Sequence, residues 1–215
     1  MAVVVVAGRK GGIGKSTIAG NLAAEFFALG YTVAALDADP QHSLAAWAEQ
    51  GHGILSQCVV KVKRGSPDEL RAKVRLSQNA VDIVLVDTPP GIQDVSYQAM
   101  LLADLVLLPC GPSPLDIFPL KEALAMALRA RGERRSKKPR IRFVPSKVLR
   151  NTNLGRGLSS SLEGLGKKVL TAIGQRIVVA EAVVSGLTLR EFAPGSTAQA
   201  EFEELAKAVD EIIRR

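Results

Sequence analysis

The amino-acid sequence predicts an α/β fold, in which a mostly parallel β-sheet is flanked by helices on both faces. Short apolar runs alternate along the chain with segments of helical periodicity, and alternating strands and helices form parallel sheets. A glycine-rich turn joins the first apolar run to the first helical pattern. At 215 residues and 47% hydrophobic residues, the chain is long enough for one well-filled core, so residues 1–215 are predicted to be one domain.

Seven apolar runs are predicted to be strands. They are residues 3–7, 31–36, 59–62, 82–86, 105–109, 141–145 and 170–173.

Helical spacing defines the first and last helices most clearly. The first helix is predicted to place Ile18, Leu22, Phe26 and Leu29 on one face, and Gly30 follows as a C-terminal cap. In the last helix, Ser196 and Gln199 are predicted to form a capping box. The residues that this helix is expected to bury are Phe202, Leu205, Val209 and Ile212.

Residues 9–17, with the sequence RKGGIGKST, predict a phosphate-binding loop. A glycine-rich turn between a strand and a helix directs backbone N–H groups and the positive end of the helix dipole at one point, where an anion binds. Lys15 is expected to neutralise the β- and γ-phosphates of a nucleoside triphosphate, and the Ser16 hydroxyl to ligate Mg²⁺. The residues predicted to bind nucleotide are Lys10, Gly11, Gly12, Ile13, Gly14, Lys15, Ser16 and Thr17.

Aspartates follow two of the predicted strands. Asp37 and Asp39 lie two apart on extended chain, so both can face the crevice at the carboxyl end of the sheet. Asp87 ends a third apolar run, which is the Walker B arrangement for holding Mg²⁺. Aspartates at strand ends also cap helices and form turns, and for Asp37 that alternative is equally well supported.

The loop departs from the ordinary G-x-x-x-x-G-K-[ST] pattern, because Arg9 stands at the first glycine position and Lys10 follows it. The pattern K-G-G-x-G-K-[ST] resembles the deviant Walker A loop of the ParA/MinD ATPases. The motif D-A-D-P-Q at 37–41 resembles their Walker A′ motif. Weaker matches at Trp47, 112–116, 174–176, 185–186 and 191–192 resemble the small ParF-type plasmid-partition proteins.

This resemblance implies a P-loop ATPase that uses ATP and Mg²⁺. By resemblance Lys10 reaches the nucleotide of a partner subunit, Lys15 serves its own nucleotide and Asp39 orients the attacking water. The expected metal-site residues are then Ser16, Asp39 and Asp87. The family further implies an ATP-dependent homodimer that binds DNA without sequence preference and hydrolyses ATP when a small ParB-like, centromere-binding protein stimulates it. The implied location is cytoplasmic and nucleoid-associated, and the cargo a plasmid; a chromosome region or a large protein assembly is the alternative.

The positive charge is concentrated in one segment. Ten basic residues and one acidic residue, Glu133, lie between positions 129 and 150, in a chain whose formal net charge is +7. Such a segment, without aromatic residues between 129 and 142, suits contact with a phosphate backbone. A solvated loop or an acidic protein partner would explain it as well. Candidate DNA contacts are Arg134, Arg135, Lys137, Lys138, Arg150, Arg156, Lys167 and Lys168.

Several other classes of protein fit the sequence poorly. Cys58 and Cys110 have no metal-ligand spacing and are expected to be buried apolar residues, which argues against a cluster-carrying electron-transfer protein. No motif indicates the acid-substrate pocket of a biosynthetic ligase. The first apolar run is too short for a signal peptide, and no run approaches a membrane span, so membrane attachment is not expected.

Overall fold

Six parallel strands form one sheet in the computed structural model, which describes residues 1–63, 66–91 and 94–214. The strand order is β3-β2-β4-β1-β5-β6. The strands are β1 Ala2–Val6, β2 Val33–Asp37, β3 Val59–Lys61, β4 Ile83–Asp87, β5 Leu105–Cys110 and β6 Arg140–Pro145. Each lies within two residues of a run predicted from the sequence, which confirms these six strands.

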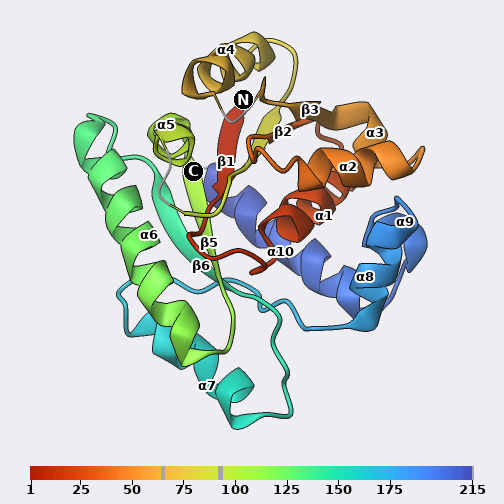
Figure 1. Cartoon of the computed structure of the whole chain (residues 1–215), viewed down its shortest axis with the longest axis vertical. Coiled ribbons are helices and arrows are strands. Elements are labelled where there is room, and N and C mark those ends of the chain that lie inside the picture. Colours follow the sequence, from red (N-terminus) through yellow and green to blue (C-terminus); the bar gives the residue numbers. More distant parts are fainter. Residues whose placement is uncertain (64–65, 92–93, 215) are drawn as a thin grey trace.

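Helices cover both faces of the sheet (Figure 1). Val3 and Val5 of β1 pack into the core on one face, and Val4 and Val6 into the core on the other, because successive side chains of a strand point in opposite directions. On the first face lie α4 Pro67–Ser77, α5 Asp94–Leu102, α6 Pro114–Glu133 and α7 Asn153–Glu163. On the second lie α1 Lys15–Ala28, α2 Ser43–Gln50, α3 Ile54–Cys58, α8 Ile177–Val184, α9 Leu189–Phe192 and α10 Thr197–Ile213.

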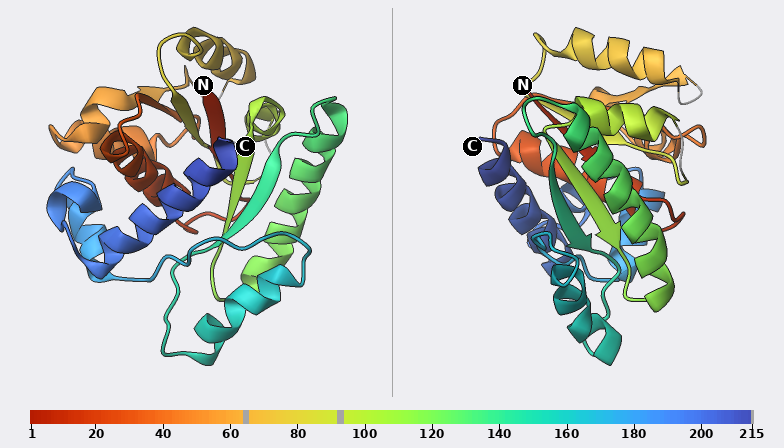
Figure 2. Two further views of the ribbon diagram at one scale, coloured as in Figure 1. Left: turned by 180° about the vertical axis from the view of Figure 1, so that it is seen from behind. Right: turned by 90° about the vertical axis from the view of Figure 1, so that its left-hand side faces the viewer.

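The topology leaves a crevice at the carboxyl end of β1. This strand pairs with β4 on one side and β5 on the other, and the chain visits β2 and β3 before it crosses to β5 and β6. The order of strands therefore reverses at β1, and ligands of open parallel sheets bind at such switch points. The strand arrows in the right-hand view of Figure 2 point to one edge of the sheet, where the loop after β1 lies.

Helix α1 follows the predicted pattern except at its end. Ile18, Leu22 and Phe26 are buried, and Gly30 adopts the left-handed conformation, with φ 88°, that the predicted cap requires. Leu29, predicted to share this face, is 39% exposed. It lies after the last helical residue, where the helical spacing no longer sets its direction.

The predicted strand at residues 170–173 is wrong. The chain runs beside β6 there, but the pairing is reduced to two isolated bridges, Phe143 with Val169 and Val148 with Gly174. Between them Pro145 has no N–H to donate, and Lys147, with φ 56°, turns out of the extended conformation. A continuous ladder cannot form across these two residues.

The capping box predicted for α10 forms only in part. Ser196 accepts a hydrogen bond from Gln199 N at 3.2 Å, as predicted. The side chain of Gln199 does not return it; its oxygen accepts from Gly195 N and its amide donates to Glu25. Of the four residues expected to be buried in α10, three are buried and Ile212 is partly buried against the core.

Both cysteines are free and buried, as expected. In the described part of the chain, no helix combines the length and apolar composition needed to cross a membrane.

The contact between α1 and α2 gives a test of the packing. An added Cβ on Gly20 of α1 would lie 2.4 Å from Cζ3 of Trp47, which is 3% exposed. Gly to Ala inside a helix ordinarily stabilises by about 0.5–1 kcal/mol, but overpacking a core costs about 1–3 kcal/mol. We therefore expect Gly20→Ala to lower the free energy of unfolding by about 1 kcal/mol in urea titrations.

Gly157 in α7 is the matched control, because a Cβ there meets no atom within 4 Å. Gly157→Ala is expected to stabilise the protein by up to about 1 kcal/mol. Stabilisation by both substitutions would contradict the tight contact between α1 and Trp47.

Candidate functional site

The loop between β1 and α1 has the backbone of an anion-binding turn. Gly12 and Gly14 have φ values of 74° and 90°, which side chains rarely adopt. Gly14 is also the N-cap of α1, and as glycine it has no side chain to cap the N–H groups of the first turn. These donors and the helix dipole favour an anion at this end of the helix. Gly11 has no positive φ, so its predicted role rests on its position in the wall of the cavity described next.

A cavity of ≈ 310 Å³ lies against this turn. Six of the eight residues predicted to bind nucleotide line it, namely Gly11, Gly12, Gly14, Lys15, Ser16 and Thr17. The structure adds Ser43, Trp47, Pro90, Lys147 and Val183, which sequence reasoning did not assign to the site. They come from separate parts of the chain, so no local motif could have grouped them.

The two predicted lysines of the loop point to different surroundings. Lys15 is 6% exposed and lines the cavity, and its Nζ donates to the carbonyl of Lys10 at 3.2 Å. Burial lowers the pKa of Lys15, while Asp87 and Asp39 oppose that shift. Lys10 does not line this cavity; its Nζ makes a short ion pair with Asp116 at the start of α6.

Ile13 serves the loop through its backbone and its packing. Its carbonyl accepts a hydrogen bond of 2.8 Å from the hydroxyl of Ser146, which follows β6. Ser146 is 2% exposed and also lies 3.0 Å from an ideal Cβ on Gly14, so it fixes the loop against the end of β6. Ile13 itself is not part of the cavity wall.

The two aspartates after β2 have different roles in the structure. Asp39 lines the cavity, and its Oδ1 accepts from Gln41 N at 2.9 Å. Asp37 is fully buried and accepts from the backbone N–H groups of Asp39 and Ala45, the latter in the first turn of α2. The expectation that Asp37 faces the crevice is therefore wrong, and the capping alternative holds, because these hydrogen bonds occupy its carboxylate.

Asp87, at the end of β4, is the unusual carboxylate. It is fully buried, and neither carboxylate oxygen has a hydrogen-bond partner among the described residues. Burial raises its pKa to about 7, although nearby Ser16 and Lys15 lower it. Buried polar groups are nearly always paired, so these oxygens fit a cation that binds with the ligand. The donor set of Ser16 hydroxyl and Asp87 carboxylate supplies the oxygen ligands that Mg²⁺ prefers.

A second cavity of ≈ 460 Å³ adjoins the first. The two cavities share Gly14, Thr17, Lys147 and Val183 in their walls. The second is bounded by Ile18 of α1, the apolar side chains of α8 and residues 173–176. Sequence reasoning missed this cavity, because its wall combines residues of α1 and α8 with residues 146–147 and 173–176, which are far apart in the chain.

The buried carboxylate of Glu201 holds one wall of the second cavity. Glu201 of α10 is 5% exposed and accepts a hydrogen bond from Gly174 N. It also accepts two from the guanidinium of Arg176, at 2.6 and 2.9 Å. Arg150 also pairs with Glu201, at 2.8 Å. An uncompensated buried charge is costly, so this carboxylate fixes residues 174–176 to α10.

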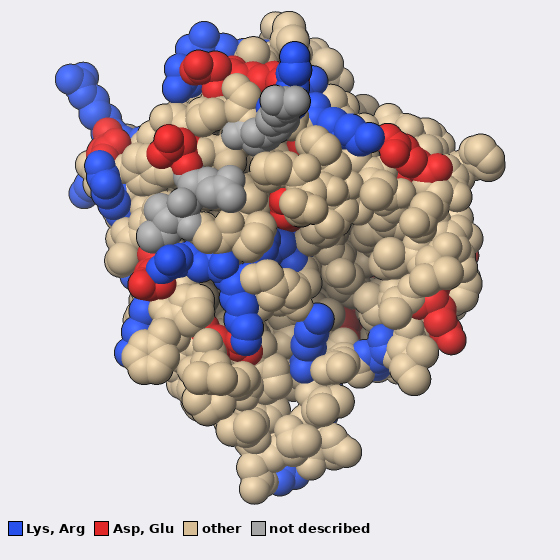
Figure 3. Space-filling view, in the orientation of Figure 1, with Lys and Arg blue, Asp and Glu red and all other residues tan. Residues whose placement is uncertain are grey.

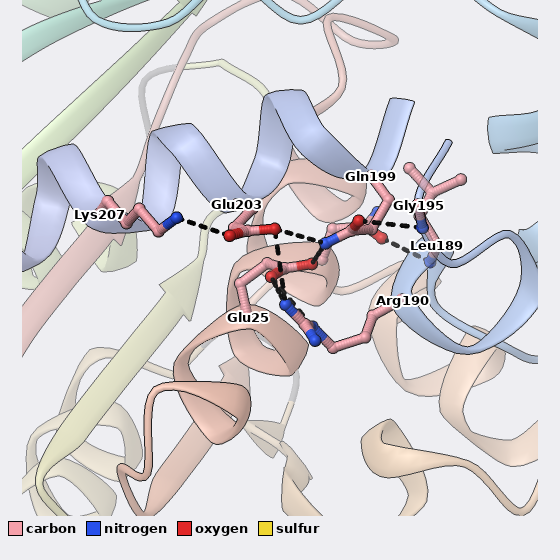
Figure 4. Close-up of polar contacts among 8 residues, drawn as sticks. Glu25, Leu189, Arg190, Gly195, Gln199, Glu203 and Lys207 are labelled. Atoms are coloured by element: carbon pink, nitrogen blue, oxygen red, sulfur yellow. Dashed lines mark hydrogen bonds and ion pairs between the residues drawn. The ribbon is translucent and has the colours of Figure 1, made fainter. Parts of the chain in front are cut away.

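Glu25 of α1 makes a similar junction with the segment that follows α8 (Figure 4). It is 2% exposed and accepts two hydrogen bonds from Arg190 of α9, at 2.7 and 3.0 Å, and one from Gln199 of α10, at 3.1 Å. One turn earlier, Asn21 accepts from Leu189 N. These contacts fix α9 and α10 to the helix that carries the phosphate-binding turn.

The basic segment is divided by β6. Four of the basic residues precede β6, at the end of the strands opposite the phosphate-binding turn, namely Arg134, Arg135, Lys137 and Lys138. Arg150 and Arg156 follow β6. Six residues of strand span about 20 Å. In Figure 3 basic side chains gather along α6 on the left and across the centre of the face. Residues 134–138 and residues 150–156 therefore lie at opposite ends of β6.

Several of the candidate DNA contacts already have partners within the protein. Arg134 donates to the Ala103 carbonyl, Lys138 pairs with Asp104 at 2.8 Å, and Arg150 pairs with Glu201. Arg156 donates to the Asn153 side chain. Lys167 and Lys168 lie beside β6, where Lys168 O accepts from Phe143 N.

The buried carboxylate of Asp87 generates a prediction about pH. The ordinary pKa of an aspartate carboxyl is 3.8, and the pKa of Asp87 in the folded protein is about 7. Between these pH values the folded protein therefore binds more protons than the unfolded chain. The free energy of unfolding should therefore fall as pH rises from about 4 to about 7, by on the order of 3–4 kcal/mol from this group. Asp87→Asn removes the titration and keeps the shape.

Urea unfolding of both proteins at pH 5 and pH 8, without nucleotide or Mg²⁺, isolates this contribution. We expect the variant to gain stability relative to the parent at pH 8 more than at pH 5. Parallel pH profiles would show that Asp87 does not titrate in this range. The variant should also lose the stabilisation that Mg²⁺ and nucleotide give the parent.

Comparisons with known proteins agree with this geometry. The family model for the CobQ/CobB/MinD/ParA nucleotide binding domain matches residues 4–189. The chain is 30% identical over 212 residues to maintenance of carboxysome distribution protein A of Halothiobacillus neapolitanus, covering 98% of this chain and 95% of that protein. It is 28% identical over 237 residues to the chromosome-partitioning ATPase Soj of Thermus thermophilus, covering 96% and 94%.

Solved structures show the same fold. A Cyanothece McdA variant in complex with ATP superposes with a TM-score of 0.79 at 17% identity, covering 100% of this chain and 96% of that one. MinD of Pyrococcus horikoshii, complexed with Mg-ADP, gives a TM-score of 0.81 at 19% identity, covering 98% and 96%. The match of the family model over most of the chain identifies this protein as a member of the CobQ/CobB/MinD/ParA family of nucleotide-binding domains.

Proposed function

We propose that this protein is an Mg²⁺-dependent ATPase of the ParA/MinD type that positions a large protein assembly by cycling between an ATP-bound dimer and a monomer. One observation carries the proposal. Two lysines five residues apart on one loop face apart, with Lys15 in the phosphate cavity and Lys10 outside it. A single nucleotide site needs only Lys15 at its phosphates. In our proposal Lys10 contacts the nucleotide that a partner subunit binds.

The two cavities support ATP as the ligand. The smaller one meets the phosphate-binding turn, and the larger one is walled mainly by apolar groups, which suits a nucleobase. Asp39 lines the phosphate cavity, where a carboxylate can orient an attacking water. Mg²⁺ bound at Ser16 and Asp87 would neutralise the phosphate charge as hydrolysis proceeds.

A dimer is supported by apolar surface beside the site. Ile177 and Val184 of α8 are 79% and 80% exposed, and Val184 also lines the larger cavity. Exposed apolar side chains next to a ligand site are typical of a surface that is buried on association. In our proposal Lys10 leaves Asp116 when the dimer forms, so the ion pair seen here belongs to the monomer.

The cargo is inferred from the relatives. The chain matches two proteins named for maintenance of carboxysome distribution, the second from Gloeobacter kilaueensis at 37% identity over 60% of the chain. We therefore favour a large protein assembly over the plasmid cargo predicted from the sequence. Nonspecific DNA serves as the surface on which the dimer is distributed, and a small partner protein stimulates hydrolysis.

DNA partition is the second candidate, since other relatives are named Soj, ParA and IncC. Deletion of the gene in its host separates the two. Our proposal expects clustered protein assemblies with unchanged plasmid and chromosome inheritance. Loss of a plasmid or of chromosomes, with assemblies evenly spaced, would favour DNA partition.

The two lysines and Asp39 give a prediction that tests the nucleotide cycle. Lys15→Ala should abolish ATP binding, because the cavity loses the charge facing the phosphates. Lys10→Ala should retain ATP binding but fail to dimerise, since its contact is made in the partner site. Asp39→Ala should bind ATP and persist as a dimer, because the attacking water is no longer oriented. Calorimetry and size-exclusion chromatography with ATP and Mg²⁺ give the two readouts.

Normal dimerisation of Lys10→Ala would contradict a role in the partner site. ATP affinity unchanged in Lys15→Ala would overturn the site itself. If Asp39→Ala hydrolyses ATP at the stimulated rate of the parent, then Asp39 has no catalytic role.

DNA binding is expected to depend on ATP, to ignore sequence and to weaken with salt. Arg135 and Lys137 are exposed, and neither side chain makes an ion pair with a described residue. Reversing both charges to Glu should weaken DNA binding about tenfold, because phosphate contacts are lost. About five contacts would give a log–log salt slope near −4 to −5. Fluorescence anisotropy with two unrelated duplexes, with ATP or ADP, measures both.

Arg75→Glu with Lys121→Glu is the control, since it makes the same change in net charge on α4 and α6. Equal weakening by both pairs would indicate a general charge effect. A strong preference for one duplex would contradict nonspecific binding.

A further inference from the structure

Lys147 occupies the junction between the two cavities. Among the described residues that line both cavities, it is the only one with an ionisable side chain, the others being Gly14, Thr17 and Val183. A nucleoside triphosphate with its phosphates at the turn and its base in the larger cavity would cross this junction with its ribose and α-phosphate. Lys147 would therefore lie beside the ribose and α-phosphate of such a ligand, together with Gly14 and Thr17 of the phosphate-binding loop.

The backbone of Lys147 is held in an unfavourable conformation. Its φ is 56°, in the left-handed region that lysine rarely adopts. The residues on both sides are fixed, since Ser146 N donates to Cys110 O at 2.8 Å and Val148 N donates to Ile173 O at 3.0 Å. Strain that the surrounding structure maintains in this way is characteristic of functional sites.

The charge of Lys147 is also available to a ligand. Its exposed ammonium forms no ion pair with a described residue. Arg176, the other cation of the larger cavity, already pairs with Glu201 at 2.6 Å. Lys15 lies at the phosphate turn and does not line the larger cavity. Among the described residues of these walls, Lys147 is the cation placed to meet an anion at the junction.

We propose that Lys147 is a nucleotide-binding residue that contacts the α-phosphate, on the ribose side of the phosphates held by Lys15. This inference rests on the proposed nucleotide site and goes beyond it, because it assigns a contact outside the phosphate-binding loop. The phosphate-binding loop recognises the phosphate groups. The contact with Lys147 makes the affinity depend on the α-phosphate, which is attached directly to the nucleoside. AMP, which carries only that phosphate, should use the same contact.

The test measures the affinities for ATP and AMP by calorimetry, with AMP measured in competition against ATP. Lys147→Met retains the aliphatic chain and removes the charge. We expect about tenfold weaker binding of both ATP and AMP, as for the loss of one charge-assisted hydrogen bond. Lys147→Arg should keep affinity within about threefold. Lys121→Met, at an exposed lysine on α6 outside both cavities, is the matched control and should change neither affinity.

Lys147→Gly separates the charge from the backbone conformation. Glycine adopts positive φ readily, so this variant should unfold at the same or a higher urea concentration than the parent. Its ATP affinity should nevertheless fall as far as that of Lys147→Met. Parent-like affinity in Lys147→Gly would overturn the proposal.

The remaining outcomes are also decisive. Unchanged ATP affinity in Lys147→Met, in a parent that binds ATP, would overturn the role of Lys147 and leave the proposed function standing. Weaker ATP binding with unchanged AMP binding would overturn the α-phosphate assignment, because the contact would then lie on the β- or γ-phosphate. A parent that binds no ATP would overturn both this inference and the proposed function.

Discussion

The direction of helix α1 is the constraint on which the site depends. Its first turn carries uncapped N–H groups, and a small rotation of the helix would aim them away from the phosphate cavity. Apolar burial of Ile18, Leu22 and Phe26 fixes the helix against the sheet. Buried polar contacts at Asn21 and Glu25 fix its rotation relative to α9 and α10, because hydrogen bonds are directional where apolar contacts are not.

The same contacts join the phosphate turn to the larger cavity. Glu25 and Asn21 hold the segment that follows α8, and Glu201 holds residues 174–176 on the opposite side. The wall of the larger cavity is thus connected to the helix that follows the phosphate-binding turn. A ligand that spans both cavities would bind one connected structure, so its phosphate and base contacts would reinforce each other.

The site retains features that cost stability. Asp87 is buried with no hydrogen-bond partner in the part of the chain that the structure describes, and Lys147 has a left-handed backbone conformation. Neither arrangement helps the free protein to fold, because desolvation of a charge and a strained φ both raise the free energy of the folded state. Both lie beside the phosphate-binding turn, where a bound cation and a bound anion would offset these costs. Such local departures from stable packing are expected at functional sites.

The sequence by itself determined the α/β class, six of the seven predicted strands and the phosphate-binding turn. Each depends on local signals, namely apolar runs of strand length and glycines at positions that need positive φ, so neighbouring residues sufficed. The family of nucleotide-binding domains could be predicted for the same reason, since its loop motif is contiguous.

Only the tertiary structure decided which of these residues act together. Asp37 and Asp39 are equivalent by spacing, but the turn into α2 gives Asp37 a capping role and leaves Asp39 in the cavity. The basic segment is continuous in sequence, yet its two halves lie at opposite ends of β6, because this strand separates them. Lys147 and the wall of the larger cavity come from segments far apart in the chain, and only the tertiary fold brings them together.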